Sequence, residues 1–263
     1  MIINTNIAAQ TGARLLSDST KALNKSLARL SSGLKIVSPE DDAAGLAVSS
    51  RFDAQINRIG AVTSNVSNAI SFSQTQDGYL KKIAKAMDRM SELSVMAQDV
   101  TKGPTDVALY QTEFAAQAAF INDLAGKQFN GVALFTAVAK NVTVDSEGAT
   151  FAMNGVGAAA AYNLTGSNLT TGAAAAQAAV GAMINTVAGD RATVGSHISV
   201  LSAYGDQLAV LRDNLTAANS RIKDVDVAEE STMFAKSNIL VQAGTAMLAQ
   251  ANSVPQSVLK LIQ

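Results

Sequence analysis

Apolar residues recur at alternating steps of three and four along most of this chain, and this period restricts it to long, paired helices. The first series is Leu16, Leu23, Leu27, Leu30 and Leu34, with Thr20 completing the steps. Such a heptad seam is typical of a helix that packs lengthwise against another helix. We expect Asn4 or Thr5 to cap its start and Gly33 to end it in the left-handed conformation.

A second and longer helix is predicted to begin at Ser38-Pro39-Glu40-Asp41. Ser38 can cap the helix, Pro39 suits its first position, and the acidic residues face the positive end of the helix dipole. The seam then continues through Phe52, Ile56, Ile59, Thr63, Val66, Ile70, Leu80, Ile83, Met87, Met90 and Leu93. A stripe of this length exceeds the helices of ordinary globular domains.

The break at Lys102-Gly103-Pro104 separates this helix from a third one. Thr105 or Asp106 can cap the third helix, and Gly126 or the turn Phe129-Asn130-Gly131 can close it, which predicts an antiparallel helical hairpin.

The pattern changes between residues 140 and 172. Val142, Val144, Phe151 and Met153 lie at strand-like spacings around Glu147-Gly148. We therefore expect a small β-hairpin or an irregular tip in this segment.

Helical periodicity returns from Val194 to Ile222, and its phase resets near Asp224, where Asp226 and Glu229 form a capping-box-like pair. The last seam is Met233, Leu240, Met247 and Val254, with Ser237, Gly244, Ala251 and Val258 interleaved at heptad spacing. Small residues on a seam predict that another helix approaches closely.

Together these patterns predict a mainly α fold, a long antiparallel helical bundle or coiled coil with a small β-hairpin or irregular tip. Residues 1–37 with 224–263 would form a terminal coiled-coil core. Residues 38–139 with 173–223 would form a helical rod, and residues 140–172 the tip.

The two ends of the chain need a partner, because a lone helix with one apolar stripe buries too little surface to offset its ordering entropy. Residues 1–37 carry Arg14, Lys21, Lys25, Arg29 and Lys35 against Asp18. Residues 224–263 carry Lys236 and Lys260 against Asp224, Asp226, Glu229 and Glu230. We expect the two ends to pair, with the apolar seams supplying the driving force, and to be partly disordered until subunits stack.

Composition argues against several other classes of function. The net charge is −1 with scattered Lys and Arg, which gives no footprint for nucleic acid or an anionic membrane. Cysteine is absent and His197 is the single histidine, so neither a catalytic triad nor a metal site is evident. We expect no enzyme activity and no cofactor, and we interpret His197 as a partly exposed helix residue. No membrane span or conventional signal peptide is apparent.

Short motifs at both ends resemble those of a known family, the bacterial flagellins. The amino-terminal ones are Met1-Ile2-Ile3-Asn4-Thr5-Asn6, Leu30-Ser31-Ser32-Gly33-Leu34-Lys35-Ile36 and Asp41-Asp42-Ala43-Ala44-Gly45-Leu46-Ala47, and Gln128-Phe129-Asn130-Gly131 is similar to the mid-chain turn. The carboxy-terminal ones are Arg221-Ile222 with Asp224, Ile239-Leu240-Val241-Gln242-Ala243-Gly244-Thr245, Leu248-Ala249-Gln250-Ala251-Asn252 and Pro255-Gln256.

The resemblance implies a minimal flagellin that lacks large outer domains and polymerises through its terminal helices into the flagellar filament for swimming motility. It also implies export through the flagellar type III apparatus, a secreted, extracellular filament, an export chaperone covering residues 224–263, and contacts with filament cap and junction proteins. The alternative is a hook-filament junction protein, which shares the terminal helices.

Flagellins are also sensed by a Toll-like innate immune receptor through an Arg, a Leu and a Glu on neighbouring helices. The matching residues in this chain are Arg89, Leu93 and Glu113. The alternative for these three residues is a role in filament contacts only.

Overall fold

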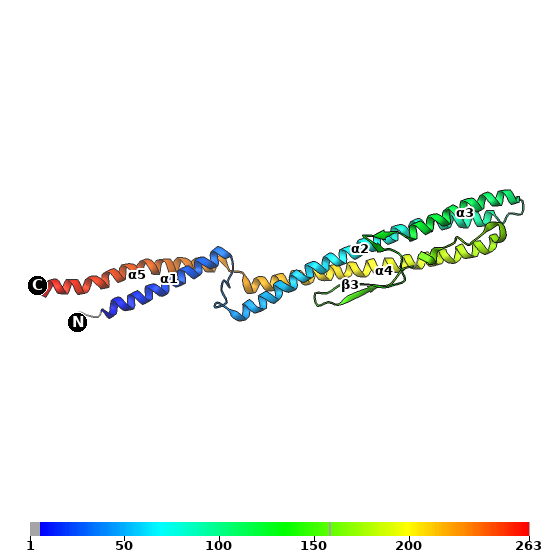
Figure 1. The fold of residues 1–263 in the computed structure, drawn as a ribbon. Helices are drawn as coiled ribbons and strands as arrows, with labels where there is room; N and C mark the ends of the chain where they lie inside the picture. Colours follow the sequence, from blue (N-terminus) through cyan, green and yellow to red (C-terminus); the bar gives the residue numbers. More distant parts are fainter. Residues whose placement is uncertain (1–5, 158, 263) are drawn as a thin grey trace. The chain divides into compact units, whose positions relative to one another are not determined.

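The computed structural model describes the backbone of residues 6–157 and 159–262 and the side chains of residues 6–157 and 160–253. Its long helices are α1 (Ile7–Ser32), α2 (Ala43–Met96), α3 (Pro104–Ala125), α4 (Leu169–Lys223) and α5 (Val227–Ile262), shown in Figure 1. Short elements between α3 and α4 are β1 (Gln128–Phe129), β2 (Val132–Ala133), β3 (Lys140–Thr143), β4 (Thr150–Met153) and the 3-10 helix η1 (Ala159–Tyr162). The predicted mainly α fold with a small β-hairpin is confirmed.

The chain divides into two compact units by its internal contacts. The terminal unit comprises residues 1–54 and 213–263, and the middle unit comprises residues 55–212. This division is coarser than the three segments expected from the sequence, and those segments stay a prediction.

The first helix ends where the sequence predicts but starts later. Asn6 caps α1, its side-chain oxygen accepting a hydrogen bond from the backbone N–H of Ala9 at 3.0 Å. Asn4 and Thr5, the expected caps, lie outside the described residues. Gly33 has a φ of 71° and donates its N–H to the carbonyl of Arg29, which confirms the left-handed end.

The second helix starts after the predicted Ser-Pro signal. Residues 38–41 form a turn, in which the Asp41 carboxylate accepts hydrogen bonds from the backbone N–H groups of Val37 and Ser38. Asp42 caps the helix instead, accepting from the N–H of Gly45 at 2.8 Å. The prediction of Ser38 as cap is wrong because the carboxylate of Asp41 holds the Ser38 backbone in the turn.

The N-cap residue of the third helix has no side chain that could accept a hydrogen bond from the first turn. Gly103 is the N-cap residue and Pro104 is the first helical residue, so the expected cap at Thr105 or Asp106 is wrong. Asp106 still contributes, because its carboxylate accepts a hydrogen bond from the N–H of Gly103 at 3.1 Å.

The core of the middle unit lies among α2, α3 and α4. Its fully buried side chains are Ile59, Leu80, Ile83, Met87, Met90 and Leu93 of α2, Phe114 and Ile121 of α3, and Val180, Val187, Val194 and Leu201 of α4. The predicted apolar seam of α2 is confirmed at Ile59, at Val66 and from Leu80 to Leu93, whereas its members Ile56, Thr63 and Ile70 are only partly buried. Helix α4 begins well before the expected periodicity and contains a kink at Gly172, where φ and ψ are non-helical.

Two hairpins connect α3 to α4. Strands β1 and β2 pair across Asn130 and Gly131, which have φ values of 48° and 77°. Strands β3 and β4 pair antiparallel with Lys140 opposite Met153, and their loop contains Gly148 at a φ of 95°. The β-hairpin expected within residues 140–172 is confirmed, and the same segment also contains η1 and the first residues of α4.

His197 is buried against the second hairpin, so its expected partial exposure is wrong. Its Nε2 accepts a hydrogen bond from the backbone N–H of Asn154 at 3.2 Å, and its ring meets the edge of Phe151 with centroids 5.9 Å apart. Burial lowers the pKa of His197 below the ordinary value of 6.5. His197 lies three residues after Val194 and four before Leu201, on the same buried face of α4, and the hairpin covers it there.

Candidate functional site: the paired terminal helices

Helices α1 and α5 lie side by side in the terminal unit (Figure 1). The side-chain amide of Asn6 donates to the carbonyl of Ala251 at 2.8 Å, which ties the start of α1 to α5. After the end of α1, the N–H of Lys35 donates to the carbonyl of Lys223 at 2.7 Å, and the N–H of Val225 donates to the carbonyl of Gly33 at 3.0 Å. The predicted pairing of the two chain ends is confirmed.

The face of α1 that α5 covers is half apolar and half small or polar. It consists of Ala9, Gly12, Leu16, Ser19, Leu23, Ser26 and Leu30, all partly or fully buried. Leu34 follows the helix and is partly buried at a bridge with Asp224. Leu27 does not belong to this face, because 52% of its surface is exposed. Among the α1 side chains only Ser26 is fully buried.

The covered face of α5 includes the small residues Ser237, Gly244 and Ala251, and it does not include the predicted Met and Leu series. It consists of Glu230, Phe234, Ser237, Val241, Gly244, Leu248 and Ala251. Met233, Leu240 and Met247, predicted as the seam, are 51%, 47% and 70% exposed. That prediction is corrected for the contact within one chain, and Val254 lies outside the described side chains.

Close approach of the two backbones explains this choice. A Cβ placed on Gly244 would stand 3.2 Å from Cδ1 and 3.6 Å from Cβ of Leu16, and one on Gly12 would stand 3.7 Å from Cδ1 of Leu248. Leu or Met at position 244 would overlap α1 at this separation. The close packing predicted from small residues is therefore confirmed at Gly244, and it turns the large residues outward.

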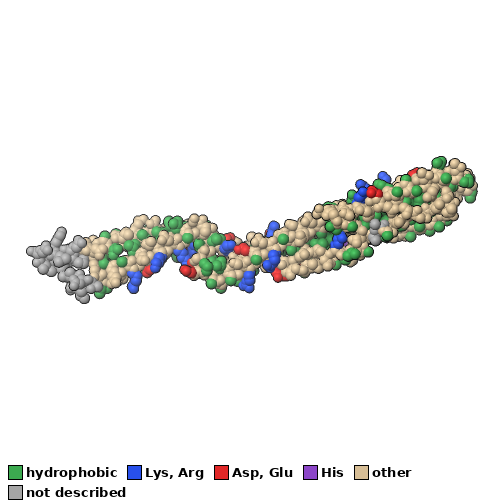
Figure 2. Space-filling view, in the orientation of Figure 1, with side chains coloured by type: hydrophobic (Ala, Val, Ile, Leu, Met, Phe, Trp, Pro, Cys, Tyr) green, Lys and Arg blue, Asp and Glu red, His purple; other side chains and the backbone are tan. Residues whose placement is uncertain are grey.

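Met233, Leu240 and Met247 form what we call the outer stripe of α5. They are seven residues apart, so they lie on one face of the helix about two turns from each other. Figure 2 shows hydrophobic side chains at the surface of the terminal helices. Contiguous exposed apolar patches mark sites where proteins bind one another, which makes the outer stripe a candidate for such a site.

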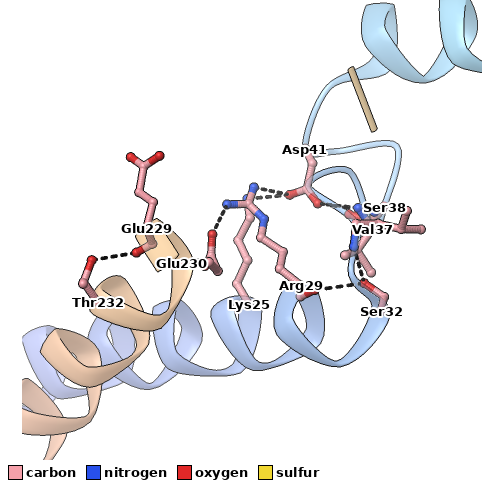
Figure 3. A network of polar contacts seen from close by, with 10 residues as sticks. Lys25, Arg29, Ser32, Val37, Ser38, Asp41, Glu229, Glu230 and Thr232 are labelled. Atoms are coloured by element: carbon pink, nitrogen blue, oxygen red, sulfur yellow. Dashed lines mark hydrogen bonds and ion pairs between the residues drawn. The ribbon is translucent and has the colours of Figure 1, made fainter. Parts of the chain in front are cut away.

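A polar network joins the end of α1, the turn after it and the start of α5 (Figure 3). The Arg29 guanidinium lies 3.5 Å from the carboxylate of Glu230 and 3.8 Å from that of Asp41. Lys25 reaches the same Asp41 oxygen at 2.5 Å. The hydrogen bond from Lys25, followed by that from the N–H of Val37, lowers the pKa of Asp41 to about 2. The expected charge match between the two ends is realised in the Arg29–Glu230 pair.

The described residues contain no group of three or more His, Cys, Asp or Glu side chains that could hold a metal ion. Within the same residues, no helix is both long and apolar enough to cross a bilayer. The chemistry of the terminal pair is that of helix packing and ion pairs.

The three residues matched to receptor recognition lie together in the middle unit. The Arg89 guanidinium donates to both carboxylate oxygens of Glu113, at 2.7 and 3.1 Å, and also to Glu92 at 2.9 Å. These hydrogen bonds, the pair to Glu113 first, raise the pKa of Arg89, and the same bonds from Arg89 lower the pKa of Glu113. Leu93 is fully buried.

Comparison with known proteins gives a consistent result over the whole chain. Residues 3–140 match the model for the bacterial flagellin N-terminal helical region, and residues 177–262 match that for the C-terminal helical region. The chain is 34% identical over 286 residues to the flagellar filament 33 kDa core protein of Treponema phagedenis, with both chains fully covered. It is 33% identical over 304 residues to the flagellin of Bacillus subtilis strain 168, again over both full lengths.

A solved structure is also similar. The crystal structure of Bacillus cereus flagellin is 25% identical, has a TM-score of 0.50, and matches 55% of this chain and 88% of that one.

Proposed function

This chain belongs to the bacterial flagellins, the structural subunits of the flagellar filament, and we propose that it polymerises through the outer stripe of its terminal helices. A flagellin is a filament protein and not an enzyme. The hook-filament junction alternative is not favoured, since the full-length relatives are flagellins and filament core proteins.

The observation that supports the outer stripe is the division of α5 into two heptad series. The small series is used within the chain against α1, and the large series is left exposed. Burying a half-exposed Met or Leu contributes on the order of 1 kcal/mol, so three per subunit can drive stacking when many subunits join. Leu16, Leu23 and Leu30 would then hold the pair together, with Leu27 available on its outside.

The test is seeded elongation of a stripe variant. Leu240→Asp places a charge at the middle of the outer stripe, and we expect purified subunits to stop elongating filament seeds in a salting-out buffer, which strengthens apolar burial. Asn252→Asp adds the same charge at an exposed position of α5 outside the stripe and should elongate. Electron microscopy and sedimentation measure the polymer. Elongation of Leu240→Asp at the control rate would contradict the proposal.

The terminal pair should gain much of its order from assembly. Its covered faces are mostly only partly buried in one chain, which leaves little apolar surface to offset backbone ordering. We expect backbone amides of α1 to exchange rapidly with solvent deuterium in the monomer and slowly in the filament. Equal, strong protection of α1 in both states would exclude coupled ordering.

The family forms the extracellular flagellar filament, and for this chain we propose export through the flagellar type III apparatus. Before export the exposed apolar stripe would let subunits associate too early. We propose that a flagellar chaperone prevents this by binding residues 224–263. Filament cap and junction proteins would contact the same terminal helices at the two ends of the polymer. Deleting residues 230–263 should abolish co-purification of the cognate chaperone, while deleting residues 1–30 should leave it intact.

Receptor recognition through Arg89, Leu93 and Glu113 stays a prediction. Arg89 and Glu113 are paired with each other at the surface, and Leu93 is buried. Cell-based signalling by the monomer should fall for Arg89→Ala relative to the unaltered chain. Equal signalling would leave these residues with filament contacts only.

A further inference from the structure

We propose that Met233 and Met247 form a redox-modification site, at which a peroxide oxidises the free subunit and blocks its addition to the filament. The proposal rests on the proposed role of the outer stripe in assembly. It assigns to the two thioethers a chemical function beyond packing.

The methionines of this chain divide sharply by exposure. Met87, Met90 and Met153 are buried in the middle unit, and Met96 and Met183 are partly buried. Met233 and Met247 are more than half exposed. Since the chain has no cysteine, these two thioethers are its most accessible described sulfur atoms.

The two exposed methionines also share one face of one helix. They lie fourteen residues apart in α5, about four turns, with Leu240 midway between them. Oxidation of either therefore changes the same apolar stripe. Leu at these positions would pack about as well, because Leu and Met have similar volumes, but Leu carries no sulfur to oxidise.

The reaction needs only a hydroperoxide such as hydrogen peroxide. The Sδ lone pair attacks the terminal peroxide oxygen, an S–O bond forms as the O–O bond breaks, and the leaving oxygen departs as water after proton transfer. Sulfur loses two electrons and the peroxide gains them. The product, methionine sulfoxide, is polar, and methionine sulfoxide reductases return it to the thioether.

A sulfoxide on the outer stripe opposes assembly because its oxygen must leave water when the stripe is covered. Burying a polar group without a hydrogen-bond partner is unfavourable, because the group loses its hydrogen bonds to water. Two such groups per subunit recur at every contact along the polymer. Oxidised subunits would thus be excluded, whereas subunits already in the filament would keep both sulfur atoms covered.

The first experiment maps the reaction with hydrogen peroxide on the full chain. Peptide mass spectrometry should find Met233 and Met247 oxidised first in the monomer, with Met87, Met90 and Met153 far behind. In preformed filaments the same two residues should react at least several-fold more slowly. Equal reaction at the buried and exposed methionines of the monomer, or no protection in the filament, would overturn the proposal.

The second experiment measures seeded elongation. Monomer carrying both sulfoxides should lose elongation, and treatment with the two stereospecific sulfoxide reductases should restore it as Met233 and Met247 are reduced. The variant Met233→Leu/Met247→Leu should elongate equally before and after peroxide. If this variant does not polymerise untreated, the reductase arm decides, because recovery must track reduction at these two residues.

The outcomes separate this proposal from the assembly surface itself. Normal elongation by doubly oxidised monomer, or loss of elongation by the peroxide-treated Leu variant, would overturn the redox site. Leu240→Asp tests the outer stripe without any oxidant. Normal elongation of that variant would therefore contradict the role of the stripe in assembly, independently of any result with peroxide.

Discussion

The helices of the terminal pair and of the middle unit share the same heptad spacing of apolar residues, but they bury these residues to very different degrees. Helix α2 buries Leu80, Ile83, Met87, Met90 and Leu93 completely, whereas α1 buries only Ser26 among its side chains. Figure 1 shows the reason: in the middle unit α2 lies with α3 and α4, while α1 has α5 alone. A helix with one neighbour can cover only one side of its apolar stripe.

The difference teaches that an identical sequence pattern can serve two purposes. In the middle unit the stripe stabilises one subunit, because a third helix and two hairpins cover what a pair would leave open. In the terminal unit the uncovered residues remain available to other chains. Assembly through the outer stripe, as proposed, would tie the stability of the terminal pair to subunit concentration by mass action.

The largest expected effect comes from shortening one leucine side chain in each of the two regions. Leu80→Ala in the middle unit should lower the free energy of unfolding by about 2–5 kcal/mol, as for other fully buried Leu side chains. Leu23→Ala, at a partly buried position, should cost about 1 kcal/mol or less in the monomer. Thermal unfolding followed by circular dichroism measures both. If the two changes cost the same, the contrast between the regions is wrong.

A smaller effect should follow from widening the terminal pair. Gly244→Leu puts a branched side chain where even a Cβ would meet Leu16 at 3.2 Å, and overpacking of this kind costs about 1–3 kcal/mol. Hydrogen exchange of α1 in filaments, with α2 as the internal reference, measures the loss of pairing. Ala249→Leu, at an exposed position of α5 outside both the outer stripe and the face that meets α1, is the matched control. If the amides of α1 stay equally protected in Gly244→Leu, the close approach of the two backbones does not determine which face of α5 meets α1.

Acid should loosen the hairpin of the middle unit before it reaches the ion pairs of the terminal unit. Burial lowers the pKa of His197, so neutral His197 contributes stability above its unfolded pKa near 6.5, and that stability is lost as pH falls towards the folded pKa. Protonated Nε2 can no longer accept from the N–H of Asn154, and losing this hydrogen bond costs about 1 kcal/mol.

The measurement for His197 is the urea midpoint of the middle unit at pH 7 and pH 5. It should fall in acid, and His197→Gln, which keeps an acceptor but does not titrate, should remove most of that change. An unchanged pH dependence in the Gln variant would assign the acid sensitivity to other groups.

The smallest effect should come from Asp41. Its pKa of about 2 means that the network with Lys25 contributes stability above the unfolded pKa near 3.8 and loses it as pH falls towards 2. Carboxyl carbon chemical shifts report the titration directly. Lys25→Met should return the pKa of Asp41 towards its ordinary value, while Lys21→Met, one turn away and exposed, should not. A pKa near 3.8 for Asp41 in the unaltered chain would contradict the ion pair between Lys25 and Asp41.

The sequence by itself determined the features that depend on neighbouring residues. Gly33 ends α1, Gly148 turns the predicted hairpin, and the apolar period places α2 as one long helix, because backbone conformation and helical period are local properties. A turn was expected at Asn130-Gly131 as the end of α3, but the β1–β2 hairpin around it was not predicted. The family motifs at both ends were readable for the same reason, as they are short and contiguous.

Tertiary structure alone decided which residues of those helices meet. On α5 the large and small residues repeat every seven positions with equal regularity, so the period cannot say which series faces α1. The 3.2 Å approach at Gly244 decides it, because a Met or Leu side chain at this position would overlap Leu16. His197 is likewise covered by a hairpin from another part of the chain. Contacts between distant segments depend on the space between them, and that space exists only once the chain has folded.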